Sequence, residues 1–219
     1  MSFLGMIAIV ATLFQGGVDA TGTAIARPLG EAHEDPSTGN YYQIFQFYGP
    51  KPYTWAHAKH MVHGYIYEGR VGQLASVKTL ETHYFLLLQF PEMRKHKTWI
   101  GLSAQCNEQA DLEWLDGTKL EDTNFRAWAA DAQRKISRTC RDHRLSGNIY
   151  PIYYMPDAFG VRWEMGQSNT DIEYMVVEFP KSEDPKAAGQ KSDSKDKPEG
   201  AKDSGTKKPA DDKGPSAGR

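Results

Sequence analysis

Three histidines at intervals of three residues form the first group in the sequence that could do chemistry. His57, His60 and His63 lie in the segment TWAHAKHMVHG. Imidazole is a common ligand of transition metals, and two histidines three residues apart on a helix can share one ion. Each step of three residues turns the helix by about 60° relative to the last, so one ion cannot easily reach all three side chains. Two interpretations follow: a solvated helix face, which we favour, and a metal site that would make the protein a metal-assisted enzyme.

Five carboxylates gather in a short stretch further along the chain: Asp111, Glu113, Asp116, Glu121 and Asp122. Glycosidases use a pair of carboxyl groups, so acid–base catalysis is one interpretation of this cluster. Asp116, however, precedes Gly117 in a turn signature, and the neighbouring carboxylates alternate along a hairpin edge, which is typical of a solvated surface. The sequence also lacks the Gly-x-Ser-x-Gly motif of hydrolases. We therefore expect a non-catalytic protein.

The two cysteines, Cys106 and Cys140, are too few for a disulfide-rich scaffold. Neither belongs to a Cys-x-x-Cys pair, so a structural zinc site is not expected. They could form one bridge in an oxidising compartment, or remain two free thiols.

Charge divides the chain into unlike parts. The whole sequence carries 26 basic and 28 acidic residues, a net charge of −2. Residues 181–219 contain 10 of the basic and 8 of the acidic residues and no large apolar side chain, which leaves residues 1–180 with a net charge of −4. A mildly acidic body without a basic stripe argues against nucleic acid as the partner. The tail has the composition of a disordered segment, either a solvated end or a tether.

The amino-terminal residues resemble a secretory signal. Phe3–Phe14 is a twelve-residue apolar run, and Val18 and Ala20 suit the small-residue positions of a cleavage site. The run is too short to span a bilayer, so no transmembrane segment is expected once it is removed. No Lys or Arg precedes it, which leaves a misassigned start or a buried strand as alternatives. We therefore assign residues 1–20 as a signal peptide and expect secretion or association with the cell envelope.

Patterns in the remaining residues predict a leader and one folded domain. Residues 21–39 are rich in Gly, Pro and Thr and are interpreted as a leader or linker, and the domain is placed at residues 40–180. A strand is expected at 41–48, followed by a helix that begins after Thr54 as N-cap. A second helix is expected after Thr79, ending at Pro91. Its buried face is expected to carry Leu80, Tyr84, Leu87 and Leu88.

The second half of the domain is expected to be rich in strands. Five segments have strand character: 98–104, 112–117, 148–155, 159–165 and 172–179. The interval 118–148 is too long for an ordinary connection, so it is either a functional loop region or partly helical, with the helix expected within 125–136. Two early helices and a late antiparallel set of strands predict the α+β class.

The order of these motifs resembles the C-type lectin-like domain. The resemblance rests on GQLASVKTLETHYFLL at 72–87, WIGL at 99–102, LEWLDG at 112–117, DTNF at 122–125 and EYMVVEF at 173–179, with Trp163 expected in the core. It covers residues 40–180 and implies the C-type lectin-like fold. In this resemblance, Met61 or Val62 and Val177 stand where the family usually has the cysteines that join helix one to the last strand, as in disulfide-poor members of bacterial type. In the family's geometry Cys106 and Cys140 lie in facing regions, which favours a local bridge over two free thiols.

The resemblance also bears on function. The family's calcium-dependent sugar site uses a Glu-Pro-Asn or Gln-Pro-Asp tripeptide, absent between Leu120 and Tyr150, and a Trp-Asn-Asp, which here reads Trp163-Glu164-Met165. Calcium requires six to eight oxygen ligands. We therefore expect no cofactor and a binding module that recognises a carbohydrate or protein ligand without this site, the alternative being a calcium-dependent lectin with unrecognised ligands. Exposed aromatic and Arg side chains anchor interfaces, and the candidate ligand-binding residues are Asp122, Asn124, Arg126, Trp128, Arg141 and Glu164.

Overall fold

The computed structural model describes residues 23–107, 110–142 and 148–181. Its helices are α1 (Trp55–Val62), α2 (Leu80–Gln89) and α3 (Ala132–Asp142), with short 3₁₀ turns η1 (Pro91–Arg94) and η2 (Leu120–Asp122). Its strands are β1 (Ile25–Glu34), β2 (Tyr41–Tyr48), β3 (Ile66–Tyr67), β4 (Arg70–Val71), β5 (Gln73–Leu74), β6 (Thr98–Cys106), β7 (Ala110–Trp114), β8 (Ile149–Asp157), β9 (Gly160–Met165) and β10 (Tyr174–Phe179). The expected α+β class is confirmed.

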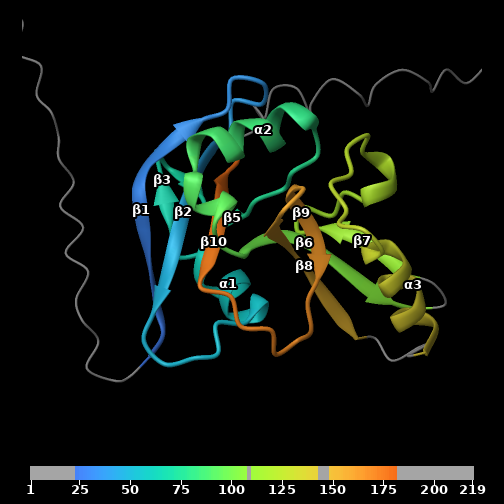
Figure 1. Ribbon diagram of the computed structural model, residues 1–219. Coiled ribbons are helices and arrows are strands. Elements are labelled where there is room, and N and C mark those ends of the chain that lie inside the picture. Colours follow the sequence, from blue (N-terminus) through green and yellow to red (C-terminus); the bar gives the residue numbers. More distant parts are fainter. Residues whose placement is uncertain (1–22, 108–109, 143–147, 182–219) are drawn as a thin grey trace, which may run out of the picture. The chain divides into compact units, whose positions relative to one another are not determined.

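One sheet connects most of the strands, in the order β1-β2-β10-β6-β8-β9. The last strand, β10, is hydrogen-bonded between β2 and β6, antiparallel to β2 and parallel to β6. β5 pairs with β10 and β7 with β6, while β3 and β4 form a separate hairpin. Figure 1 shows α1 and α2 beside the half of the sheet that contains β10, and α3 beside the half that contains β7.

The chain divides into two units, Met1–Ser182 and Glu183–Arg219. The second unit, interpreted above as a disordered tail, lies outside the described residues, as does the proposed signal peptide at 1–20.

The WIGL segment in β6 lies at the centre of the core. Trp99, Ile100 and Leu102 are fully buried. Gly101 allows the backbone of β5 to approach, because a Cβ at this position would lie 2.5 Å from the carbonyl oxygen of Leu74. A side chain here would separate β6 from β5, so this position of the motif requires glycine.

Both helix starts expected from the sequence are present. The Oγ1 of Thr54 accepts a hydrogen bond from the His57 amide, and the Oγ1 of Thr79 accepts one from the Thr82 amide. Each hydroxyl thereby satisfies one of the amide groups left without a partner in the first turn.

The face that α2 buries differs from the expected one. Leu80, Tyr84 and Leu88 are exposed, and the helix instead buries Thr82, His83 and Leu86. The two buried polar side chains have partners inside the domain. The Thr82 hydroxyl donates to Asp35 Oδ2 at 2.8 Å, and His83 Nδ1 lies 2.7 Å from the Tyr154 hydroxyl oxygen. A buried polar group costs little when it is hydrogen-bonded, which allows these residues to replace the leucines in the core.

The interpretation of residues 21–39 as a leader is also corrected. Ile25–Glu34 form β1, the edge strand of the sheet, antiparallel to β2. Pro28 lies within β1, and proline is tolerated in a strand where no further strand needs its amide group. The folded part therefore begins before residue 40.

The long interval after β7 contains regular structure that covers one end of the sheet. It passes through η2, makes a bridge in which Trp128 pairs with Trp163 of β9, and continues as α3. The helix expected within 125–136 thus begins later and extends to Asp142. The sulfur atoms of Cys106, at the end of β6, and Cys140, in the last turn of α3, form a disulfide across 34 residues.

Candidate functional site

The loop between β7 and α3 is held in shape by its own arginine. The Arg126 guanidinium donates through Nη1 to the carbonyl oxygen and hydroxyl of Thr123 and to the carbonyl oxygen of Phe125, and through Nη2 to the carbonyl oxygen of Leu120. Four acceptors from one short segment use most of the fixed donor positions of a guanidinium. Arg126 therefore fixes the loop, and the exposed side chains of Asp122 and Asn124 stand on the segment it fixes.

An aromatic cluster forms the floor beneath this loop. The ring of Trp163, in β9, meets those of Phe125, Trp128 and Trp114 edge-on, at centroid distances of 5.4, 5.4 and 5.7 Å. Trp163 is fully buried, as expected, and Trp128 is only partly exposed. Such edge-to-face contacts stabilise aromatic pairs beyond the area they bury. Trp128 thus contributes chiefly to the support of the loop.

His83 extends this cluster to α2. Its ring lies 5.0 Å from that of Phe125 and 5.5 Å from that of Tyr154. Burial disfavours the charged imidazolium and lowers the pKa of His83 to about 4. His83 is therefore neutral at physiological pH, and α2 contacts the candidate loop through an uncharged ring.

Glu164 is buried and forms an ion pair with the ammonium group of Lys135. Only 7% of the residue is exposed. Its Oε2 lies 3.1 Å from Nζ of Lys135 on α3, and its Oε1 accepts from the amide of Met165 at 3.2 Å. The carboxylate that the resemblance places at a calcium-ligand position is thus neutralised by a lysine of α3, a contact the sequence analysis did not anticipate.

α3 is the most basic element near the loop. It packs against β6, β7 and β9 and buries Ala132, Ile136 and Cys140. Arg141, a candidate from the sequence, is exposed on this helix. Arg134 and Arg138 are exposed on it as well and were missed. The spacing of Ala132, Ile136 and Cys140 was the signal that the helix extends past Ile136.

Of the six candidate residues, the structure therefore places four along 122–128, one on α3 and one in β9. Trp128 and Glu164 lie where the loop meets the sheet, because Trp128 forms a β-bridge with Trp163, the residue before Glu164 in β9.

His57 and His60 of α1 and its C-cap residue His63 are exposed. Within residues 23–107, 110–142 and 148–181, no group of three or more His, Cys, Asp or Glu side chains is arranged to hold a metal ion. In the same part of the chain, no helix is long and apolar enough to cross a membrane.

Comparison with known families agrees with this architecture. Residues 51–148 match the family model described as the lectin C-type domain. The protein contains a C-type lectin-like domain, as its motifs predicted. Domains of this family are generally non-catalytic, typically extracellular, and bind carbohydrate or protein.

Several solved structures are similar to the chain. The C-type lectin CEL-I from Cucumaria echinata is 20% identical with a TM-score of 0.46, and the match covers 68% of this chain and 93% of that one. The mouse scavenger receptor C-type lectin carbohydrate-recognition domain is 16% identical with a TM-score of 0.42, covering 67% and 92%. EMS16, an antagonist of collagen receptor integrin alpha2beta1, is 17% identical with a TM-score of 0.39, covering 65% and 92%. No curated protein sequence matches the chain.

Proposed function

We propose that this protein is a secreted, non-catalytic binding module that recognises a carbohydrate or protein ligand without the family's usual calcium site. The observation that carries the proposal is the contact between Glu164 and Lys135. The ammonium group lies 3.1 Å from the carboxylate, where a calcium ion would need that carboxylate as a ligand. Met165, at the next position, supplies no oxygen from its side chain. One carboxylate that is already paired is a poor calcium ligand, since calcium needs six to eight oxygens.

The ligand-binding surface in this proposal is the end of the domain formed by residues 118–142. The exposed groups offered there are Asp122 and Asn124 on the loop fixed by Arg126, together with Arg141 on α3. The disulfide and the aromatic floor hold both segments on the sheet. A surface ordered before binding loses little conformational entropy when the ligand arrives.

The position of β1 is compatible with secretion. Cleavage after Ala20, as the sequence suggests, leaves every residue of β1 in the mature chain, because β1 starts at Ile25. Amino-terminal sequencing of the protein from its source is expected to read from Thr21. An intact Met1 would contradict the assignment.

A glycan array, read with calcium and with EDTA, tests the calcium claim. We expect binding that is equal in both conditions, and no heat on titration of the protein with calcium. Binding that disappears in EDTA would instead establish the calcium-dependent alternative.

Two double variants locate the surface. Asn124→Ala with Arg141→Ala, which changes two exposed residues of this surface, is expected to weaken the binding of whichever array ligand scores highest. The matched control, His57→Ala with His60→Ala, changes two exposed residues of α1 and is expected to bind like the unchanged protein. Loss of binding in the histidine variant, together with retained transition metal in the unchanged protein, would favour the metal-assisted alternative.

A further inference from the structure

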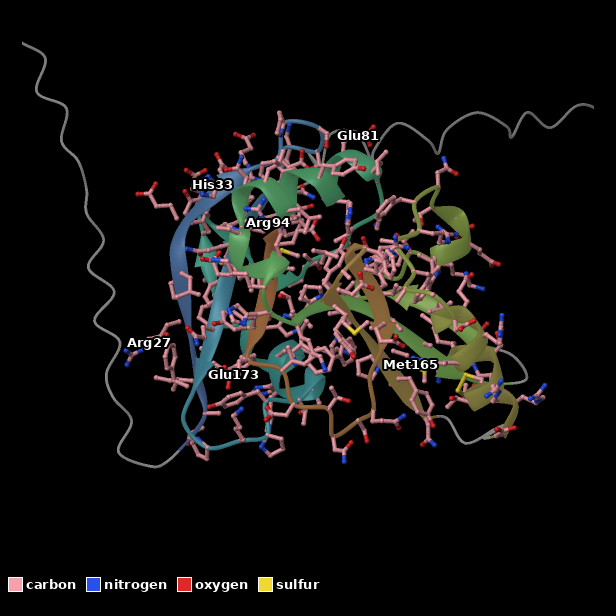
Figure 2. The ribbon with its side chains drawn as sticks, viewed as in Figure 1. Arg27, His33, Glu81, Arg94, Met165 and Glu173 are labelled. Atoms are coloured by element: carbon pink, nitrogen blue, oxygen red, sulfur yellow. A yellow bond between two sulfur atoms is a disulfide. The ribbon has the colours of Figure 1, made fainter. Side chains whose placement is uncertain are left out.

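Three arginines lie on one side of α3. At 100° per residue, Arg134, Arg138 and Arg141 fall within an arc of about 60°. The buried side chains of Ala132, Ile136 and Cys140 point to the opposite side of the helix. Seven residues of helix separate the first arginine from the last, which is about 10 Å. These three residues, called the arginine face below, form a short cationic ridge directed into solvent, and Figure 2 shows nitrogen-tipped side chains projecting outward from α3.

Few contacts within the protein occupy the arginine face. Arg134 Nη2 lies 3.1 Å from Asp131 Oδ1, and Arg141 Nε lies 3.8 Å from Asp142 Oδ1. All four of these side chains are more than half exposed. Exposed pairs of this kind are weak and compete poorly with a ligand. Arg138 forms no ion pair with any residue in the described ranges.

α3 is held rigidly although its outer side is free. The disulfide fastens its last turn to β6, and Lys135 joins its first half to Glu164 of β9. Lys135 is therefore committed to the sheet, whereas the arginines are not. A helix anchored in this way presents its guanidinium groups at fixed spacing, so little order has to be gained on binding.

We propose that the arginine face binds sulfated glycans, and that the ligand class of the proposed binding module is an anionic polysaccharide. Guanidinium groups donate two parallel hydrogen bonds to planar or tetrahedral oxyanions, which suits sulfate and carboxylate better than an ammonium group does. A ridge about 10 Å long requires a ligand that repeats its negative charge along its length. Single-stranded nucleic acid is disfavoured, because α3 carries no aromatic side chain on which a base could stack. This inference rests on the proposed function and names its ligand.

Binding of the full chain to heparin tests the inference. We compare heparin with the same polymer after complete desulfation and N-acetylation, at 50 and 200 mM salt. Heparin is expected to bind and the desulfated polymer not to bind. With three ion contacts, and the salt dependence of single-stranded polyanions, the affinity for heparin should fall roughly 18-fold between 50 and 200 mM salt.

Charge variants locate the site. Arg134→Gln, Arg138→Gln and Arg141→Gln together are expected to weaken heparin binding by about tenfold or more, since each exposed ion contact is worth up to a factor of about five. A matched control removes the same charge from Arg27, Lys59 and Arg94, which are exposed on β1, α1 and η1. Figure 2 labels Arg27 and Arg94 far from α3. The control should bind heparin as the unchanged protein does, and both variants should remain folded because all six side chains are exposed.

Five results would overturn the inference. Equal losses in the two variants would show that overall charge, not the arginine face, binds heparin. Undiminished binding of the desulfated polymer would remove the role of sulfate. A DNA oligonucleotide that binds as tightly as heparin would make the ridge a general polyanion site. Binding of a neutral glycan or a protein without any binding of heparin would refute the ligand class and leave the proposed function standing. If no ligand on the array binds, both the ligand class and the proposed function are refuted.

Discussion

Removal of the disulfide between β6 and α3 should destabilise the domain by an amount that follows from the length of the loop it closes. The bond joins residues 34 apart. A crosslink over that distance lowers the entropy of the unfolded chain by about 12.6 cal/mol/K, which corresponds to about 3.8 kcal/mol at 25 °C. Cys106→Ala with Cys140→Ala adds a small cost for lost packing, because both side chains are buried. For a domain of this size, we expect the unfolding temperature measured by calorimetry to fall by roughly 8–15 °C.

The two single variants provide the control for this prediction. Either replacement alone breaks the bond, so Cys106→Ala, Cys140→Ala and the double variant should be destabilised to nearly the same extent. Two free thiols would behave differently: the single effects would add, and each would be about 1 kcal/mol, as for other small truncations in a core. Additive single effects, or two thiols that alkylate in the native protein without reductant, would refute the reasoning.

Three further predictions concern buried groups. Because the pKa of His83 is lowered to about 4 in the folded protein, the unfolded chain takes up a proton near pH 6.5 that the folded chain does not. The free energy of unfolding should therefore be highest above pH 6.5 and fall by up to about 1.4 kcal/mol per pH unit as the pH drops toward 4. The His83→Gln variant should show a shallower slope. Lys135→Met leaves Glu164 buried without its cation and should lower the free energy of unfolding, measured in urea, by about 1–3 kcal/mol. Adding Glu164→Gln to this variant should restore most of the loss. An unchanged free energy of unfolding in Lys135→Met would contradict the ion pair. Leu86→Ala should cost about 2–4 kcal/mol and Leu88→Ala less than about 0.5, and the reverse order would contradict the face that α2 buries.

Features specified by neighbouring residues could be predicted from the sequence. Thr54 and Thr79 cap their helices because the cap uses only an amide three residues away. The WIGL segment is a core strand because its own apolar run requires burial. Capping and strand patterning act over a few residues, so the sequence alone contains the information.

Apart from the Cys106–Cys140 bridge, which the family resemblance indicated, features that depend on distant partners could not be predicted. The run Phe85–Leu88 in α2 has apolar side chains on more than one face, so its pattern does not select the buried one. The selection comes from hydrogen bonds of Thr82 and His83 to residues 47 and 71 positions away. In the candidate site, the neutralisation of Glu164 depends on Lys135, which is 29 positions distant and belongs to a helix whose full length was not recognised.

The position of β10 has a consequence for how the protein is made. The last strand of the domain to be synthesised lies in the middle of the sheet, between β2 and β6, and is not an edge strand (Figure 1). While the chain is still growing, β2 and β6 have no connection through the sheet, and each exposes an edge that could pair with other chains. The domain can therefore complete its fold only after Phe179 has left the ribosome. Until then, the two half-sheets are open to aggregation through these edges.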